Sequence, residues 1–161
     1  MILVSACLLG QNVRYKGDGC AQKILLKPEV RAHLVPICPE CMGGLPTPRP
    51  PAEIQGLDGG EGVWQGIAKV INNVGQNVTE YYQKGALIAL AATKTHTITA
   101  AILKERSPSC GTHVIYDGSF SGRKIAGLGV TAATLIHAKV PLYSEEELTP
   151  ELIKHLLEHD K

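Results

Sequence analysis

Short apolar runs alternate along the chain with segments whose apolar residues follow helical spacing. The runs predict buried strands at 2–4, 34–37, 68–71, 98–103 and 140–143. Pro36 places the second run toward an edge or a strand end, because proline cannot donate a ladder hydrogen bond. We therefore expect several short strands rather than a few long ones.

The intervening segments predict four helical regions. Two short pieces are expected within 20–33, because Pro28 interrupts the helical spacing there. A longer helix follows Asn77 or Thr79 and continues through residue 91, and another spans 130–137. Thr149 followed by Pro150 is typical of a helix start near the end of the chain. Strands that alternate with helices predict an α/β fold: one domain, with a parallel sheet in a Rossmann-like three-layer architecture.

Glycine and proline mark the segments between these elements. Residues 43–51 contain four prolines and predict a stiff extended loop. Residues 54–64 are rich in glycine and predict an irregular segment, and Gly118 and Gly122 indicate turns around a serine-rich connection. Gly127 and Gly129 precede a helix without the complete dinucleotide fingerprint, so we expect them to serve backbone packing at the helix entrance.

Composition narrows the class of protein. The chain has 161 residues, of which 44% are hydrophobic, so it can form one globular domain without disulfide bonds. Its formal net charge of +1 is too balanced to create a broad positive field for long nucleic acid. We also read no secretory signal and no membrane span, and therefore expect a cytoplasmic protein with no membrane partner.

Three of the five cysteines occupy equivalent places. Cys7 and Cys38 follow predicted strands directly, and Cys110 lies in the loop that leaves the strand at 98–103. Loops at the carboxyl ends of parallel strands converge, so these three thiols can meet at one site. A free cysteine is often only a small buried apolar residue. Here each lies among turn residues, which favours a metal site. Cys20 is expected to pack near a helix start without a ligand role.

Cys38 and Cys41 also form a Cys-x-x-Cys pair. Such a pair is found in redox couples and in tetrahedral zinc sites. The glycines and prolines that follow argue against the long helix that a thioredoxin-like motif requires. A structural zinc site formed by Cys7, Cys38, Cys41 and Cys110 is the alternative that remains open.

Several longer motifs carry a resemblance to a known family. The chain resembles the bacterial thiouracil desulfidase family, once known only as a domain of unknown function, over nearly its whole length. The motifs are Val-Ser-Ala-Cys-Leu-Leu-Gly at 4–10, Val-Arg-Tyr at 13–15, Cys-Pro-Glu at 38–40, Gly-Gly-Leu-Pro-Thr-Pro-Arg at 43–49, Leu-Lys at 103–104, Ser-Pro-Ser-Cys-Gly at 107–111 and Gly-Leu-Gly-Val-Thr at 127–131.

The resemblance implies one desulfidase-like domain over residues 1–161 that carries a 4Fe-4S cluster. It assigns three cluster ligands, Cys7, Cys38 and Cys110, and leaves the fourth iron open for the sulfur of a thiolated pyrimidine such as 2-thiouracil. The family's catalytic acid and serine match Glu40 and Ser107. The implied reaction replaces C=S by C=O with release of sulfide and without electron transfer.

Arg49 and Cys41 are the remaining candidates near these motifs. The planar donors of Arg49 suit a uracil carbonyl or a phosphate, so Arg49 is a candidate for substrate binding. Cys41 departs from the family pattern and is able to occupy the open iron. Two alternatives to the enzyme follow from the cysteines: a non-catalytic structural or interaction module with a four-cysteine zinc site, and a cluster-carrying protein for sulfur transfer or redox chemistry.

Overall fold

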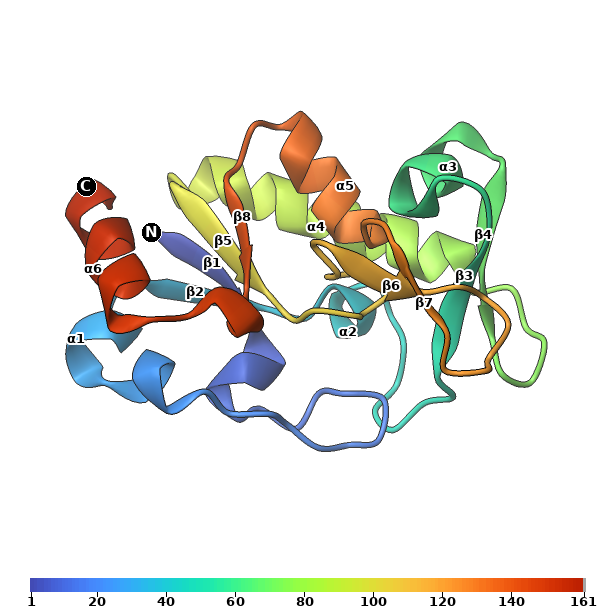
Figure 1. The fold of residues 1–161 in the computed structure, drawn as a ribbon, viewed down its shortest axis with the longest axis horizontal. Coiled ribbons are helices and arrows are strands. Elements are labelled where there is room, and N and C mark those ends of the chain that lie inside the picture. The colour runs from blue at the N-terminus through green and yellow to red at the C-terminus, as the bar shows by residue number, and fades with distance from the viewer. Residues whose placement is uncertain (161) are drawn as a thin grey trace.

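A four-stranded parallel sheet forms the centre of the protein (Figure 1). The computed structural model describes residues 1–160, so Lys161, the last residue of the expected domain, lies outside the described residues. The strand order is β2-β1-β5-β8. The strands are β1 (Ile2–Ser5), β2 (Leu34–Ile37), β5 (Ala100–Leu103) and β8 (Leu142–Ser144). The predicted parallel sheet is confirmed, with β5 and β8 each beginning two residues later than expected.

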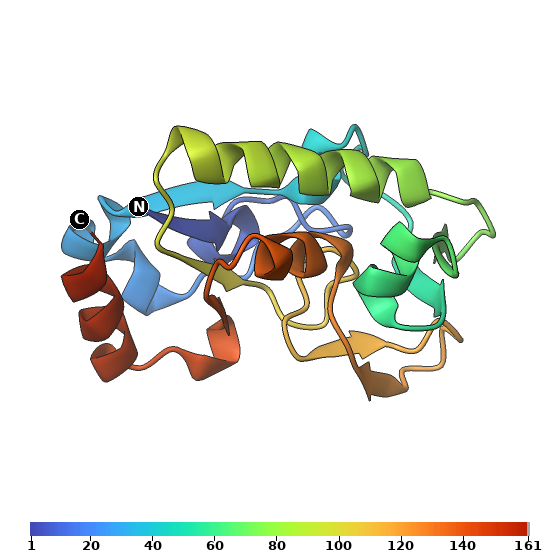
Figure 2. The same ribbon diagram turned by 90° about the horizontal axis from the view of Figure 1, so that it is seen from above.

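Helices cover both faces of this sheet. Side chains alternate between the faces of a strand. Accordingly, Ile2 and Val4 pack on one face and Leu3 packs on the other. The first face is covered by η1 (Ala6–Leu9), η2 (Lys23–Leu26), α1 (Pro28–Arg31) and α6 (Pro150–His159), and the second by α4 (Thr79–Thr95) and α5 (Val130–His137). Figure 2 shows α4 running along the sheet. The expected three-layer α/β architecture is therefore confirmed.

Side chains near both predicted helix starts accept hydrogen bonds from backbone N–H groups, although the N-cap residue of α4 is Val78 rather than the expected Asn77 or Thr79. Asn77 Oδ1 accepts hydrogen bonds from the backbone N–H of Thr79 at 3.0 Å and from its hydroxyl at 2.6 Å, just where α4 begins. Thr149 Oγ1 accepts from the Leu152 N–H at 3.1 Å, and Pro150 occupies the first turn of α6. These side chains satisfy backbone donors that have no partner inside the helix.

Two antiparallel strand pairs were not predicted. The expectation of an irregular segment at 54–64 is wrong, because this region contains β3 (Ala52–Gly56) and α3 (Gly59–Gln65), and β3 pairs with β4 (Ala68–Asn72). Ile54 and Val63 are buried in a separate apolar cluster, and this burial outweighs the weak local propensity of the glycines. The second pair is a hairpin that joins β6 (Val114–Tyr116) to β7 (Lys124–Ala126) through the predicted turns. The strand predicted at 68–71 thus exists, but outside the parallel sheet.

A close contact between two helices fixes the segment that follows β2. The one-turn helix α2 (Pro39–Met42) follows β2 and lies against α4 at Gly85. A Cβ at Gly85 would lie 1.9 Å from the Pro39 carbonyl oxygen, so a residue without a side chain is required here. This approach places Tyr82, one turn earlier on α4, beside α2. The remaining short helix is η3 (Glu145–Glu147).

Within residues 1–160, no helix combines the length and apolar character needed to cross a membrane.

Candidate active site

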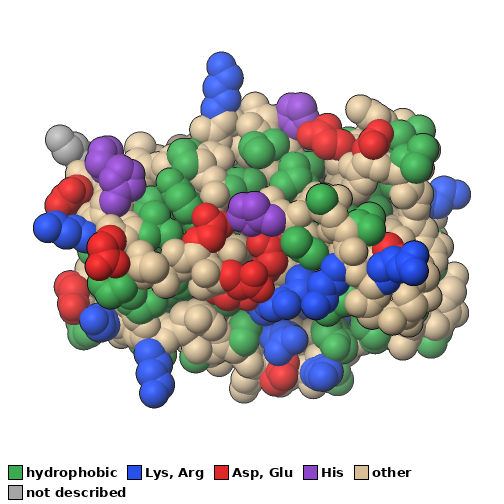
Figure 3. Space-filling model, in the orientation of Figure 1, with side chains coloured by type: hydrophobic (Ala, Val, Ile, Leu, Met, Phe, Trp, Pro, Cys, Tyr) green, Lys and Arg blue, Asp and Glu red, His purple; other side chains and the backbone are tan. Residues whose placement is uncertain are grey.

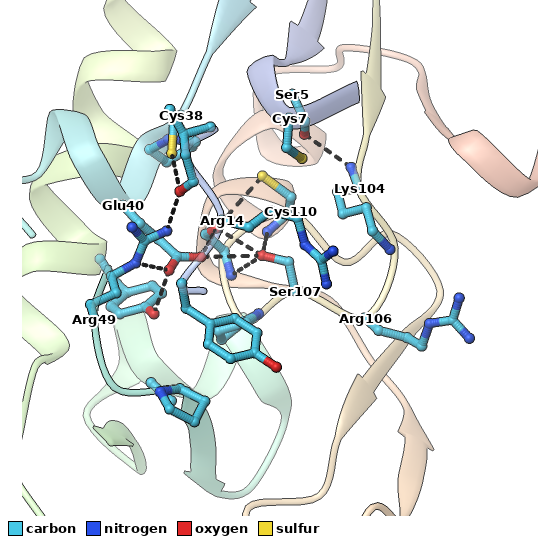
Figure 4. Close-up of a pocket in the computed structure, with 18 of the residues that line it drawn as sticks. Ser5, Cys7, Arg14, Cys38, Glu40, Arg49, Lys104, Arg106, Ser107 and Cys110 are labelled. Carbon is cyan, nitrogen blue, oxygen red and sulfur yellow. Dashed lines mark hydrogen bonds and ion pairs between the residues drawn. The ribbon is translucent and has the colours of Figure 1, made fainter. Parts of the chain in front are cut away.

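The three cysteines predicted to converge line one cavity. Cys7 lies in η1 after β1, Cys38 follows β2, and Cys110 lies in the loop after β5. The cavity has a volume of about 500 Å³ at the carboxyl ends of these strands. Cys7 and Cys110 are buried and point toward one another in Figure 4. The topology therefore brings together thiols that are far apart in sequence, as expected for the edge of a parallel sheet.

The thiols of the cavity resist ionisation in the protein alone. Burial raises the pKa of Cys110, and burial raises the pKa of Cys38 to about 12. A hydrogen bond with Cys20 and burial together raise the pKa of Cys7. Cys20 lies three residues before η2, near a helix start as expected, and donates its backbone N–H to the Cys7 carbonyl at 2.9 Å. Metal binding displaces protons from such thiols, because the thiolate is the ligand.

The described residues do not form a site for a single metal ion. Among residues 1–160, no three His, Cys, Asp or Glu side chains are close enough together to hold a single ion. Cys41 does not line the cavity. Its sulfur lies 3.3 Å from Thr47 Oγ1 and 3.8 Å from the Val13 carbonyl oxygen, which Cys38 Sγ also contacts at 3.9 Å. This position does not favour a four-cysteine zinc site. A polynuclear cluster has different demands, because each cysteine binds a different iron and the sulfurs lie farther apart.

Glu40 is the carboxylate that faces the same cavity. It is carried by α2, whose first helical residue is Pro39. Its Oε1 accepts hydrogen bonds from Arg49 Nε at 3.0 Å and Tyr82 Oη at 2.9 Å. Its Oε2 accepts from Ser109 Oγ at 3.0 Å and lies 3.4 Å from Ser107 Oγ. Figure 4 shows Glu40 between Arg49 and Ser107. The carboxylate is therefore fixed from both sides beside the cysteines.

Arg49 lies in the cavity wall, but its donors are already engaged. It is buried, and besides Glu40 it donates to three oxygen atoms: the Pro46 carbonyl at 3.2 Å, Thr47 Oγ1 at 3.1 Å and the Val13 carbonyl at 2.8 Å. Burial alone would lower the pKa of the guanidinium, but the charge of Glu40 raises it. These contacts indicate that Arg49 positions Glu40 rather than binding a substrate. The substrate contact expected for Arg49 stays a prediction.

Ser107 and Ser109 belong to a tightly bonded loop around Cys110. Ser107 Oγ accepts from the backbone N–H of Ser109 at 3.1 Å and of Cys110 at 3.0 Å, which is the turn role common for serine. The two hydroxyls lie 2.9 Å apart, and Ser109 Oγ also lies 3.6 Å from Cys110 Sγ. The pair thus links the Glu40 carboxylate to the thiol of Cys110.

The glycine segment before α5 closes against this loop, as expected from the sequence. A Cβ at Gly129 would lie 2.4 Å from the Ser109 carbonyl carbon. The close approach allows Gly129 to donate its N–H to the Gly111 carbonyl at 2.8 Å, and Thr131 to donate to the Ser109 carbonyl at 2.9 Å. The glycines therefore serve backbone packing that holds the Cys110 loop.

A buried carboxylate supports the other side of the loop. Glu105 is 3% exposed, and its carboxylate accepts five hydrogen bonds from the backbone N–H of Thr112, His113 and Val114 and from the side chains of Thr112 and His113. Burial alone would raise the pKa of Glu105, but the backbone donors lower it to about 2. Its negative charge is therefore stable at neutral pH and ties the segment after Cys110 to the end of β5.

Basic side chains line the outer part of the cavity. Arg14, Lys104 and Arg106 belong to the lining, and each also pairs with an acidic residue. Figure 3 shows Lys and Arg side chains gathered next to acidic ones on this face. Because each cation is paired with an acidic residue, this face carries both signs of charge and no strong positive potential.

Sequence reasoning missed two groups that bond to Glu40. Tyr82 lies within the predicted long helix and Ser109 within the motif at 107–111, and neither was assigned a role in the site. Neither has a local signal, because both act through contacts with α2, which is distant in sequence. The chemistry of Tyr82 is visible only once the packing of α2 on α4 is known.

Comparison with known proteins places this arrangement in a family. The model of the 2-thiouracil desulfurase family matches residues 2–147. The chain is 49% identical over 148 residues to the uncharacterized protein YbbK of Bacillus subtilis (strain 168), covering 92% of this chain and 97% of that protein. The solved structure of the [4Fe-4S]-dependent thiouracil desulfidase TudS superposes with a TM-score of 0.83 and 42% identity, covering 96% of each chain. The chain therefore belongs to the 2-thiouracil desulfurase family.

Proposed function

We propose that this protein hydrolyses the C=S bond of a thiolated pyrimidine such as 2-thiouracil, with a 4Fe-4S cluster held by Cys7, Cys38 and Cys110. The observation that carries the proposal is the shared cavity: three thiols from three strand ends and one fixed carboxylate line the same space. The dependence of the TudS relative on a [4Fe-4S] cluster supports the same cofactor here.

The donor set fits such a cluster. All three candidate ligands are thiols, which are the usual protein ligands of iron-sulfur clusters. They come from three separate loops and do not form a single-ion site. Three ligands leave one iron without a protein ligand. When bound, the cluster supplies a soft Lewis acid for the thione sulfur of the substrate.

The chain's own residues provide the proton chemistry. Glu40 accepts a proton from the attacking water, a role that suits a carboxylate fixed beside the reacting carbon. Arg49 and Tyr82 hold Glu40 Oε1, so Oε2 is the oxygen that faces the two serine hydroxyls. Ser107 positions water or substrate next to Glu40. The net reaction is thiouracil plus water giving uracil plus hydrogen sulfide, which balances without any electron donor.

The test is anaerobic reconstitution with iron and sulfide, followed by incubation with 2-thiouracil. We expect about four irons per chain, absorbance in the region near 400 nm, and uracil and sulfide released in equal amounts without a reductant. A colourless protein with stoichiometric zinc would instead support the structural module. A brown protein that releases no sulfide from 2-thiouracil would support a cluster carrier.

Two cysteine variants sharpen this test. Cys110→Ser should lose the cluster and turnover together, because it removes a ligand. Cys41→Ser is the matched control and should keep both, because Cys41 lies outside the cavity lining. Loss of the cluster in Cys41→Ser with retention in Cys110→Ser would contradict the proposed ligand set.

A further inference from the structure

Aromatic side chains are concentrated on the wall of the active-site cavity. The chain has five Tyr, one Trp and one Phe. Four of these seven line the cavity: Tyr15, Tyr82, Tyr116 and Phe120. Aromatic rings pack in offset or edge-to-face contact with other flat rings, and small-molecule sites use them to hold planar ligands. The wall therefore suits a planar heteroaromatic ligand independently of the cysteine chemistry.

Phe120 differs from the other three because its backbone is strained. Its φ angle is +56°, in the left-handed region that side chains with a Cβ disfavour. The ring is nevertheless 37% exposed, so it is not buried in a core that would explain the strain. A conformation of this kind persists only where its surroundings impose it.

The surroundings that impose it come from β3. Glu53 Oε1 accepts hydrogen bonds from the backbone N–H of Gly118 at 2.9 Å and of Phe120 at 3.2 Å. Gln55 Nε2 donates to the Gly118 carbonyl at 2.8 Å. A Cβ at Gly118 would lie 2.6 Å from the Ile54 carbonyl oxygen, so the turn is packed directly on β3. These contacts hold the backbone of the turn and leave the ring free to form part of the cavity wall.

We propose that Phe120 is a substrate-binding residue whose ring packs against the pyrimidine ring of the substrate. The inference rests on the proposed function, because it assigns a contact to the substrate of the same cavity. Phe120 carries no polar group, so it acts through packing alone. It belongs to the turn between β6 and β7, apart from Cys7, Cys38 and the partners of Glu40. Removing the ring should therefore weaken substrate binding and leave the cysteines and Glu40 in place.

Two substitutions of Phe120 distinguish the effect of losing the ring from the effect of the backbone strain. Phe120→Ala removes the ring and keeps a Cβ at positive φ, whereas Phe120→Gly removes both. In the reconstituted enzyme, both variants should raise the KM for 2-thiouracil about five- to tenfold with kcat little changed. Phe120→Gly should melt about 2–4 °C above Phe120→Ala, because glycine relieves the backbone strain. Phe120→Tyr should keep the KM within about twofold of the wild type.

The neighbouring Ser121→Ala is the control, since this side chain is exposed in the same turn and does not line the cavity. It should leave the KM unchanged. The inference is overturned by a wild-type KM in Phe120→Ala. It is also overturned if Phe120→Gly restores the wild-type KM, because the effect would then follow the backbone rather than the ring.

Calorimetric titration with 2-thiouracil supplies a readout besides turnover. Phe120→Ala and Phe120→Gly should both bind about five- to tenfold more weakly than the wild type. An unchanged Kd in both variants overturns the inference. A wild-type protein that binds 2-thiouracil but releases no sulfide would contradict the proposed reaction alone, with the loss of binding in the Phe120 variants still supporting the contact.

Discussion

The phenolic hydroxyl of Tyr82 donates a 2.9 Å hydrogen bond to Glu40 Oε1, from a side chain that is 2% exposed. Burial raises the pKa of Tyr82 well above its usual value, and the nearby Glu40 charge raises it further, so the phenol remains a donor at neutral pH. The two residues are 42 positions apart in sequence. Their contact exists because Gly85 lets α2 lie directly on α4.

Tyr82→Phe should lower kcat about tenfold with little change in KM. The variant keeps the ring in its apolar environment and removes only the donor that orients Glu40. A hydrogen bond to a charged group contributes about 1.5–3 kcal/mol, and a tenfold rate change corresponds to about 1.4 kcal/mol. Steady-state kinetics on the reconstituted protein provide the measurement. Tyr81→Phe, at the adjacent exposed position of α4, should match the wild type. Equal kcat in the two variants would remove Tyr82 from the positioning network.

Glu40→Gln should keep the brown colour and lose at least about 100-fold in kcat, because the amide cannot accept the proton from water. The iron content should match the wild type, since the cysteines are unchanged. Absorbance near 400 nm and sulfide release measure the two properties in one sample. Glu29→Gln, at an exposed position of α1, should keep both. A rate within about twofold of the wild type, roughly 0.4 kcal/mol, would show that Glu40 is not the base.

Glu105→Gln should destabilise the fold at neutral pH by up to about 3 kcal/mol. The pKa of Glu105 is about 2 in the folded protein against an ordinary value of 4.5, and this difference corresponds to about 3 kcal/mol. Because the folded pKa is the lower one, the stabilisation is complete above about pH 5 and declines as the pH falls from 4.5 toward 2. Urea unfolding of the cluster-free protein at pH 7, 4 and 3 measures it.

The free energy of unfolding of the wild-type protein should decrease as the pH falls from 4.5 toward 2, because Glu105 becomes protonated. Glu105→Gln should show a smaller decrease, because it has no carboxylate at this position. Glu146→Gln is the control, because Glu146 is exposed and pairs with Arg106 at the surface, where an ion pair contributes little. Parallel stability curves for the wild type and Glu105→Gln would rule out the buried carboxylate as the source of the acid sensitivity.

Gly85→Ala should destabilise the protein by up to about 2 kcal/mol, although alanine is the better helix former. Helix propensity alone favours alanine by about 1 kcal/mol. The added Cβ would meet the Pro39 carbonyl oxygen at 1.9 Å, and overpacking of this kind typically costs about 1–3 kcal/mol. Turnover should fall as α2 moves Glu40 away from Tyr82. Thermal unfolding and kcat are the measurements, with the exposed Lys84→Ala on the same helix as control. A Tm at or above that of the wild type would contradict the close helix contact.

The local pattern predicts much of the central fold. Helix starts such as Thr149-Pro150 are local chemistry, so they are readable from a few neighbouring residues. The apolar runs of β1 and β2 were also identified, because buried parallel strands are apolar on both faces. The local pattern did not predict the two antiparallel strand pairs, and the reason is physical. Ile54 becomes a strand residue through burial against Val63 and Tyr82, and such burial has no local signature.

The sequence by itself determined the chemical inventory: two cysteines directly after apolar runs and a third in the loop after another, a carboxylate two residues after one of them, and serines beside another. Tertiary structure alone decided which side chains meet. In the folded protein Cys41 does not line the cavity, and Arg49 donates its N–H groups to protein oxygen atoms. Tyr82 donates its hydroxyl to the Glu40 carboxylate. The physical reason is that residue type and capping act over a few positions, whereas the contacts of a site depend on how helices and strand ends pack across the whole chain.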